Sequence, residues 1–192
     1  MDPQQLLISK SDVLKNLLSY SIDKYGIAFD KCAKVIANAL KEKNTIFWCG
    51  NGGSAAESSH LAAELIGRFK KNRIPLSSVS LNSDTSVITC IANDFGYNRI
   101  FSRQLEGLGK KGDVLVILST SGESENVLEV LRKAKELEII SIALLGKDGG
   151  SAISLSDFSI VIESEETARI QEMHLLFGHL LCEYAEIGLG ID

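Results

Sequence analysis

The stretch Thr45-Ile-Phe-Trp-Cys49, followed at once by Gly50-Asn-Gly-Gly-Ser54, decides the fold class. A short run of apolar, β-favouring residues that ends in a glycine loop predicts a buried strand leading into a helix. Helical spacing of apolar residues separates four further runs of this kind, which are 76–81, 113–118, 139–145 and 159–162. Continuous apolar strands alternating with helices are typical of a parallel sheet covered on both faces. We therefore expect an α/β fold with a doubly wound, mainly parallel five-stranded sheet.

The chain before this sheet is predicted to be helical. Apolar residues recur at helical intervals on both sides of Gly26, which predicts two helices between Ser11 and Lys43. We treat 1–43 as an N-terminal helical arm and 44–192 as the domain that contains the sheet. A length of 192 residues fits one compact domain with additions rather than two independent domains.

Composition excludes several classes of protein. With 45% hydrophobic and 23% charged residues the chain is globular, and its net charge of −5 provides no basic excess for generic nucleic-acid binding. The N-terminus lacks a cationic start followed by an apolar run, and no stretch approaches 18 apolar residues, so we expect a cytoplasmic protein without a membrane partner. The four cysteines have no C-x-x-C spacing, which argues against zinc ribbons and disulfide scaffolds; Cys49 and Cys90 are expected to be buried and structural.

Two loops are the candidate ligand sites, because ligands of doubly wound sheets bind beyond the carboxyl ends of the strands. The first, 49–54, is rich in glycine but lacks the dinucleotide and P-loop patterns. The second, Ser119-Thr-Ser-Gly-Glu-Ser124, places four hydroxyl side chains and a glycine where a strand turns into a helix. Such a turn suits a phosphate, and it equally suits ordinary helix capping, so both interpretations stay open at this point.

The three histidines differ in their helical positions. His60 and Glu64 are four residues apart and can face one site, as a metal pair or a base pair, although this spacing is also common on solvated helices. Gln171 and His179 interrupt an apolar helix and lie about 80° apart around its axis, on one broad face. His174 lies about 140° from His179, so we assign it to packing or to an interface.

Seven motifs in one order give the chain a specific resemblance. They are C-G-N-G-G-S (49–54), H-L-A-A-E-L-I-G-R-F (60–69), N-D-F-G (93–96), F-S-R-Q (101–104), S-T-S-G-E-S (119–124), G-K-D-G-G (146–150) and T-A-R-I-Q-E-M-H (167–174). Together they cover nearly the whole chain, which resembles the phosphoheptose isomerases of the sugar isomerase (SIS) domain family. The resemblance implies a flavodoxin-like SIS domain over 44–192 and a homotetramer whose contacts involve the N-terminal arm.

The resemblance also implies the site residues. It assigns a zinc ion to His60, Glu64, Gln171 and His179, and the acid/base chemistry to Glu64 and His179. It assigns substrate binding to Glu64 and Gln171 and to two groups of loop residues. The first group is Asn51, Gly52, Gly53, Ser54, Asn93 and Asp94. The second group, which binds the phosphate, is Ser119, Thr120, Ser121 and Ser124. Two segments depart from the usual family pattern: Glu123 places a negative charge near a bound phosphate, and 55–59 is atypical.

The implied activity is a ketose–aldose isomerisation. It interconverts sedoheptulose 7-phosphate and D-glycero-D-manno-heptose 7-phosphate through an enediol, as the first step towards ADP- or GDP-heptose for bacterial surface polysaccharide. Two alternatives stay open: a related, non-catalytic SIS protein that associates with the replication initiator, and an isomerase of another phosphosugar. The first alternative is disfavoured by Glu64 and His179, because the matching positions of the initiator-associating relative are neither acidic nor histidine.

Overall fold

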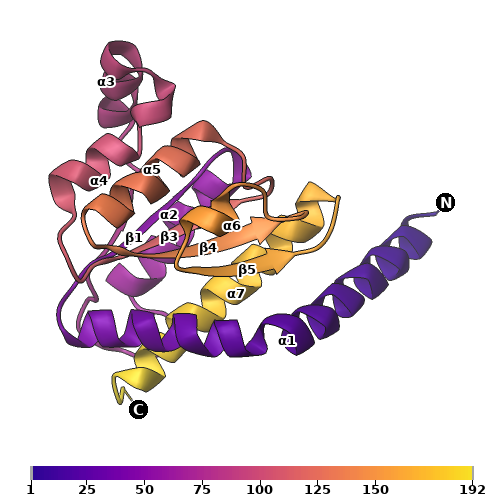
Figure 1. Cartoon of the computed structure of the whole chain (residues 1–192). Helices are drawn as coiled ribbons and strands as arrows, with labels where there is room; N and C mark the ends of the chain where they lie inside the picture. Colours follow the sequence, from indigo (N-terminus) through magenta and orange to yellow (C-terminus); the bar gives the residue numbers. More distant parts are fainter. Residues whose placement is uncertain (1, 192) are drawn as a thin grey trace.

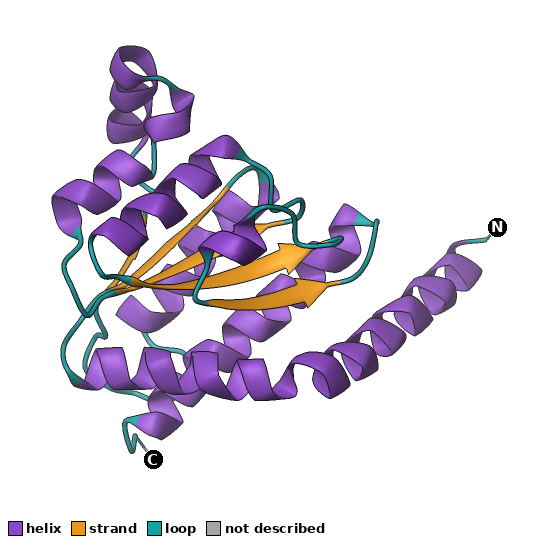
Figure 2. Ribbon diagram, in the orientation of Figure 1, coloured by secondary structure: helices purple, strands orange, loops and turns teal. Residues whose placement is uncertain are grey.

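The computed structural model describes residues 2–191 and contains the predicted five-stranded sheet (Figures 1 and 2). All strand pairs are parallel and the strand order is β2-β1-β3-β4-β5. The strands are β1 (Ile46–Gly50), β2 (Ser78–Ser80), β3 (Val114–Ser119), β4 (Ile140–Gly146) and β5 (Phe158–Ile162). The chain reverses its direction of progress across the sheet between β1 and β3, which makes the carboxyl ends of these two strands the expected ligand position.

Helices cover both faces of the sheet, as Figure 2 shows. One face carries α1 (Pro3–Lys41), α2 (Gly53–Ile66) and α7 (Thr167–Gly188), whose apolar residues share one core cluster. The other face carries α3 (Thr85–Phe95), the 3₁₀ helix η1 (Tyr97–Arg99), α4 (Ser102–Leu108), α5 (Glu125–Glu136) and α6 (Ala152–Leu155). The predicted doubly wound fold is therefore confirmed.

The alternation of side chains along β1 explains why both faces hold a core. Trp48 belongs to the cluster beneath α1, α2 and α7, whereas Phe47 and Cys49 belong to the cluster on the opposite face. All five residues of β1 are buried, so an apolar run without polar alternation is what this central strand requires. The indole Nε1 of Trp48 donates a hydrogen bond of 2.9 Å to Ser78 Oγ on β2, which satisfies its buried polar atom.

The N-terminal arm differs from the prediction of two helices, because α1 is one helix of 39 residues. Gly26 lies inside it, and a glycine in a helix costs only about 1 kcal/mol relative to alanine. The C-terminal half of α1 packs on α7 and β5, and this burial outweighs the local cost. No helix among residues 2–191 is both long and apolar enough to span a bilayer.

Helices α2 and α7 approach each other closely on their shared face. A Cβ atom added to Gly178 on α7 would lie 2.4 Å from Leu61 Cδ1 on α2, and Leu61 is completely buried. A Cβ atom added to Gly53, at the start of α2, would lie 2.2 Å from the amide nitrogen of Gln171. Both helices begin at the carboxyl edge of the sheet, so they run parallel to each other.

Replacing Gly178 by alanine tests this close approach. Because the new methyl group meets a buried leucine that has no free space to enter, we expect the free energy of unfolding to fall by about 1–3 kcal/mol. Gly107→Ala in α4 is the matched control: its Cβ meets nothing within 4 Å, so the better helix propensity of alanine should leave stability unchanged or slightly raised. Urea denaturation of both variants measures the difference, and equal stabilities would contradict the packing argument.

Candidate active site

A pocket of about 290 Å³ lies at the carboxyl ends of β1 and β3, where the strand order predicts a ligand site. We call it the edge pocket. Its lining comes from the glycine loop, the serine–threonine loop and the start of α7. The lining residues are Asn51, Gly52, Gly53, Ser54, Leu118, Ser119, Thr120, Ser121, Ser124, Thr167 and Gln171. The structure thus brings together both predicted ligand loops and Gln171, and it adds Thr167, which sequence reasoning missed.

Three helix N-termini meet at the edge pocket. Helix α2 begins at Gly53, α5 follows its N-cap Ser124, and α7 begins at Thr167. The N-terminus of a helix carries partial positive charge and N–H groups without intrahelical partners, so three of them together favour an anion. No lysine or arginine lines the pocket, and hydroxyl and amide groups supply the remaining donors. This arrangement favours a phosphate group over capping alone.

The serine–threonine loop is held in a defined shape. Gly122 has φ = +66°, and a Cβ atom there would lie 2.0 Å from the carbonyl oxygen of Gly149, so only glycine fits this position. The backbone N–H of Gly122 donates to Ser119 Oγ. The carboxylate of Glu123 accepts hydrogen bonds from the backbone N–H and the hydroxyl of Ser151, so its charge is engaged by the neighbouring 146–151 loop.

Asn51 of the glycine loop is fixed by residues that sequence reasoning missed. Its side-chain amide exchanges two hydrogen bonds with the amide of Asn126, at 2.9 and 2.8 Å. The hydroxyl of Tyr97 donates to Asn51 Oδ1 over 3.1 Å. Asn126 is buried in the first turn of α5, so this pair ties the first ligand loop to the helix that follows the second.

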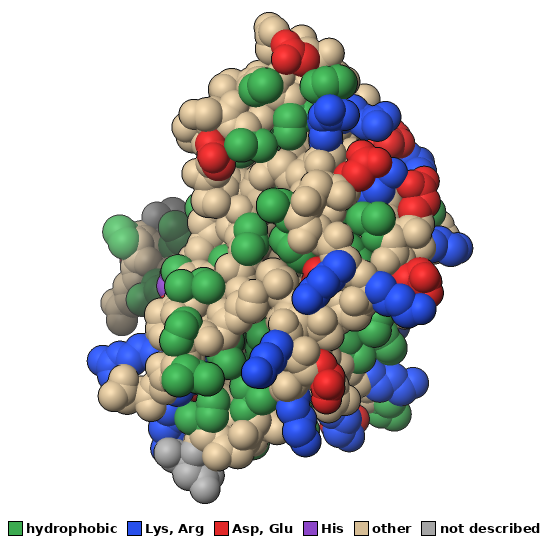
Figure 3. All heavy atoms as spheres, turned by 90° about the vertical axis from the view of Figure 1, so that its left-hand side faces the viewer, with side chains coloured by type: hydrophobic (Ala, Val, Ile, Leu, Met, Phe, Trp, Pro, Cys, Tyr) green, Lys and Arg blue, Asp and Glu red, His purple; other side chains and the backbone are tan. Residues whose placement is uncertain are grey.

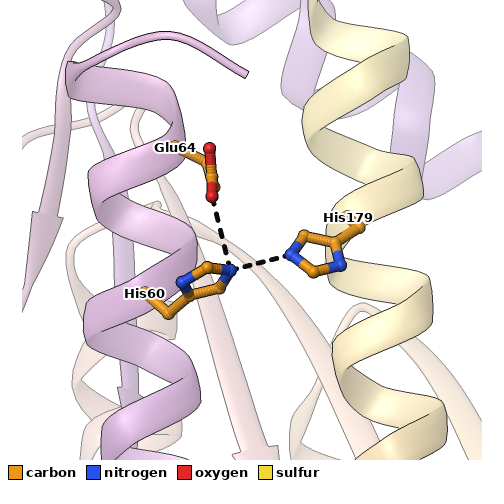
Figure 4. A group of neighbouring side chains, drawn as sticks. All are labelled: His60, Glu64 and His179. Atoms are coloured by element: carbon orange, nitrogen blue, oxygen red, sulfur yellow. Dashed lines mark hydrogen bonds and ion pairs between the residues drawn. The ribbon is translucent and has the colours of Figure 1, made fainter. Parts of the chain in front are cut away.

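A second group of polar side chains lies between α2 and α7. His60 and Glu64 project from α2 and His179 from α7 towards one point (Figure 4). The Nε2 atoms of the two histidines are 2.8 Å apart, and Glu64 Oε1 is 3.4 Å from His60 Nε2. The ligand atoms of all three residues lie within 4.8 Å of one another. We call this group the His60–Glu64–His179 cluster.

This cluster fits a zinc ion. Two imidazole nitrogens and one carboxylate oxygen are a donor set of catalytic zinc sites, which leave a position open for substrate. Burial lowers the pKa of His179, and the neighbouring His60 lowers it further, although Glu64 raises it. The lowered pKa favours the neutral imidazole, which is the form that binds a metal or accepts a proton.

The other predicted site residues are placed as follows. Gln171 packs against Gly53 in the edge pocket, and its role as a metal ligand stays a prediction. Asn93 and Asp94 lie on α3, hydrogen-bonded to each other, and do not line the edge pocket. Their substrate contacts also stay predictions.

The predictions for His174 and the cysteines are tested directly. His174 is completely buried and its Nε2 lies 2.9 Å from the carbonyl oxygen of Leu145, so the assignment to packing is confirmed. Burial lowers the pKa of His174 to about 4. Cys49 is buried as expected, but Cys90 is exposed on α3, so the expectation of burial was wrong there. Helix α3, which carries Cys90, stands away from the sheet in Figure 1.

Glu57 is an ionisable residue near both sites that sequence reasoning did not identify. It follows Gly53 by four residues and precedes His60 by three, so all three lie on one side of α2. Its Oε2 atom is buried and has no hydrogen-bond partner among residues 2–191. Burial raises the pKa of Glu57 to about 7, although a hydrogen bond with Ser54 lowers it.

The edge pocket and the cluster are separated by a length of helix that the sequence determines. On α2, Gly53 and His60 are seven residues apart, which corresponds to about 10 Å along the axis. On α7, Gln171 and His179 are eight residues apart, or about 12 Å. An anion site and a set of proton and metal ligands therefore face the same pair of helices at a separation of about 10 Å.

Comparison with known proteins agrees with this geometry. The model of the SIS domain family matches residues 11–146. A phosphoheptose isomerase from Helicobacter pylori is 46% identical over 172 residues, 90% of either chain. One from Nitratiruptor is 54% identical over 148 residues, covering 77% of this chain and 79% of the relative. The solved structure of a phosphoheptose isomerase from Neisseria gonorrhoeae superposes with a TM-score of 0.90 at 35% identity, covering 97% of this chain and all of that one.

The raised pKa of Glu57 predicts how the free energy of unfolding depends on pH. The unfolded chain loses this proton near the ordinary value of 4.5, whereas the native chain keeps it to about pH 7. The free energy of unfolding of the native protein should therefore fall, relative to Glu57→Gln, as the pH rises from 4.5 through 7. Denaturation at pH 4.5 and pH 8 measures this, with the exposed Glu136→Gln as the control for loss of one charge. A difference between wild type and Glu57→Gln that does not change with pH would refute the burial argument.

Proposed function

The chain belongs to the SIS domain family, and we propose that it is a phosphoheptose isomerase that interconverts sedoheptulose 7-phosphate and D-glycero-D-manno-heptose 7-phosphate. The observation that carries the proposal is the pairing of an anion pocket with the His60–Glu64–His179 cluster on one pair of helices. Relatives of high identity over most of the chain are phosphoheptose isomerases. These relatives do not favour the alternative of an initiator-associating protein.

The edge pocket binds the phosphate end of the sugar in this proposal. The N–H groups at the starts of α2, α5 and α7 and the hydroxyls of Ser119, Thr120, Ser121 and Ser124 donate to the phosphate oxygens. Binding energy at this remote group orients the other end of the substrate without taking part in the reaction.

The separation of the two sites fits the length of a seven-carbon sugar. A standard C–C bond is about 1.52 Å, so at tetrahedral angles the six bonds from C1 to C7 span about 7.5 Å, and the ester oxygen and phosphorus extend this to about 10 Å. A phosphate held in the edge pocket therefore places C1 and C2 close to the cluster, which lies about 10 Å away along α2. The same geometry disfavours much shorter phosphosugars as alternative substrates.

Glu64 and His179 share the proton transfers between C1 and C2. Isomerisation removes a proton from one carbon, forms an enediol, and returns a proton to the neighbouring carbon, so it needs a base at the carbons and an acid at the oxygens. Glu64 offers a carboxylate that is three-quarters buried, and His179 a neutral imidazole. Both groups reach the same point between α2 and α7.

His60, Glu64 and His179 would hold a zinc ion; the family resemblance adds Gln171, which lines the edge pocket in this structure. A bound zinc ion supplies Lewis-acid polarisation of the carbonyl and hydroxyl oxygens. His60 would serve as a ligand only. With one atom of each on the metal, Glu64 would keep its second carboxylate oxygen, and His179 its second ring nitrogen, for the proton transfers.

Isomerase assays on sedoheptulose 7-phosphate, with and without a chelator, test the function and the metal together. We expect turnover that chelation abolishes and added Zn²⁺ restores. Glu64→Gln should lower kcat by about 10²–10⁴-fold with little change in KM, because an amide cannot take up or release the proton. Glu136→Gln, an exposed change on α5, should behave as wild type. Near wild-type turnover by Glu64→Gln would remove Glu64 from the mechanism, and turnover only on another phosphosugar would reassign the substrate.

Assembly into a homotetramer in the cytoplasm completes the proposal. The N-terminal half of α1 extends beyond the sheet and its flanking helices in Figure 1. It exposes Leu6, Leu7 and Ile8, of which Leu7 is 68% exposed. Further apolar side chains gather towards the lower left of the face in Figure 3. Exposed apolar side chains such as those of α1 are typical of an interaction site. In this proposal, the heptose phosphate that the isomerase forms serves as precursor of an activated heptose for surface polysaccharide.

Light scattering coupled to size-exclusion chromatography checks the assembly. We expect a mass near four times 20.8 kDa for the whole chain. Replacing Leu7 by glutamate should shift the protein towards smaller oligomers, because a charge is placed between the exposed apolar residues Leu6 and Ile8. Lys15→Glu, an exposed change on the same helix, controls for altered charge. A monomeric wild type would overturn this part of the proposal.

A further inference from the structure

The connection between α2 and β2 is pinned by a buried ion pair next to the His60–Glu64–His179 cluster. The side chains of Arg73 and Glu186 are only 2% and 3% exposed, and Arg73 Nε donates to Glu186 Oε1 over 2.8 Å. The carboxylate of Glu186 also accepts hydrogen bonds from the backbone N–H groups of Phe69, Lys70 and Lys71. Four donors therefore converge on one carboxylate.

The ionised state of Glu186 follows from these contacts. Burial by itself would raise the pKa of Glu186, but the hydrogen bonds from the Lys70 and Phe69 N–H groups, from Arg73 and from the Lys71 N–H lower it below its usual value. A buried charge that is paired and fully hydrogen-bonded holds its partners rigidly, because releasing any of them leaves the charge unsatisfied. The segment 67–75 has neither helix nor strand, so this pair is its main anchor.

The anchored segment contacts the cluster from the α7 side through Phe69. The ring of Phe69 stacks on that of His179, with centroids 5.4 Å apart and planes inclined by 23°. This contact restricts rotation of the imidazole, whose Nε2 is thereby aimed at His60. Glu186 follows His179 by seven residues on the same side of α7, so the anchor and the histidine share one rigid element.

The same pair contacts the cluster from the α2 side through Arg73. Its guanidinium nitrogens donate to the carbonyl oxygens of Glu64 and Leu65, at 2.9 and 2.8 Å. Carbonyl groups in the last turn of a helix have no intrahelical partners, so these bonds fix the turn that bears the Glu64 side chain. One ion pair thus positions a cluster residue on each helix.

We propose that Arg73, Glu186 and Phe69 are positioning residues that hold Glu64 and His179 in the geometry required to bind the metal ion. This inference rests on the proposed zinc site but not on the identity of the sugar. None of the three residues touches the edge pocket, so phosphate binding does not depend on them. Residues that orient metal ligands typically affect metal affinity about 10–100-fold.

Competition with a chromophoric chelator for Zn²⁺ tests the proposal on the full-length protein. Phe69→Leu keeps apolar bulk and removes the aromatic face, so zinc affinity should fall about 10–100-fold. Phe69→Tyr restores the ring and should retain wild-type affinity, because the half-buried ring gives its hydroxyl access to water. Arg73→Lys keeps the charge but loses the fork that reaches two carbonyls, and should also weaken zinc binding. Lys71→Ala, which changes an exposed side chain in the same segment and keeps the backbone N–H, is the matched control and should have no effect.

The measurements separate the inference from the proposed function. We expect Phe69→Leu to lower kcat on sedoheptulose 7-phosphate with little change in KM and to melt within a few degrees of Lys71→Ala. A zinc affinity of Phe69→Leu equal to wild type overturns the inference, and so does a wild-type chain that binds no zinc. A wild type that binds zinc with the expected variant pattern but isomerises no heptose phosphate leaves the inference standing and overturns the function alone.

Discussion

The close parallel packing of α2 and α7 is the constraint on which both sites depend. Gly178 allows Leu61 to enter the interface, and Gly53 allows Gln171 to do so. Because both helices start at the carboxyl edge of the sheet, they run parallel, and the facing residues of α7 lie three to five positions further from the helix start than those of α2. A side chain at Gly178 would collide with buried Leu61 and shift one helix against the other, and the three-residue cluster next to it would lose the convergence that a metal ion needs.

Three levels of contact follow from this packing. The first joins Gly53 to Gln171 at the edge pocket, the second joins His60 to His179, and the third is the Arg73–Glu186 pair at the end of α2. The first level presents helix N-termini suited to an anion, the second groups possible metal and proton ligands, and the third contacts the second from both helices. Binding, chemistry and support are thus arranged in order along one pair of helices.

The edge pocket offers neutral hydrogen-bond donors rather than charged side chains. The net charge of the chain is −5, and the lining of the edge pocket, among the residues described, offers backbone N–H, hydroxyl and amide groups rather than lysine or arginine. The arginine that lies nearest to the metal ligands is occupied by Glu186 and by carbonyl oxygens. Burial also keeps His174 neutral and favours the protonated form of Glu57, so the charged groups around the reacting carbons are few.

Much of the fold could be predicted from the sequence, because local periodicity reports burial on one or two faces. All strand ends lie within one residue of the predicted runs, apart from the start of β2, which differs by two residues. The sequence also determined which residues can share a helix face, which paired His60 with Glu64 and Gln171 with His179. The structure brings His60, Glu64 and His179 together and leaves Gln171 in the edge pocket. It could not decide that Gly26 leaves α1 unbroken, since that depends on packing against α7 and β5.

Only the tertiary structure decided which distant residues meet. Arg73 and Glu186 are 113 residues apart, and no local sequence pattern around either residue predicts its contact with the other. The same holds for Asn126 against Asn51 and for Phe69 against His179. Sequence spacing determines direction around a helix axis, whereas the partner across a gap depends on how whole helices are placed on the sheet. The sequence could therefore indicate the candidate metal and proton ligands, but it could not indicate the residues that hold those ligands in place.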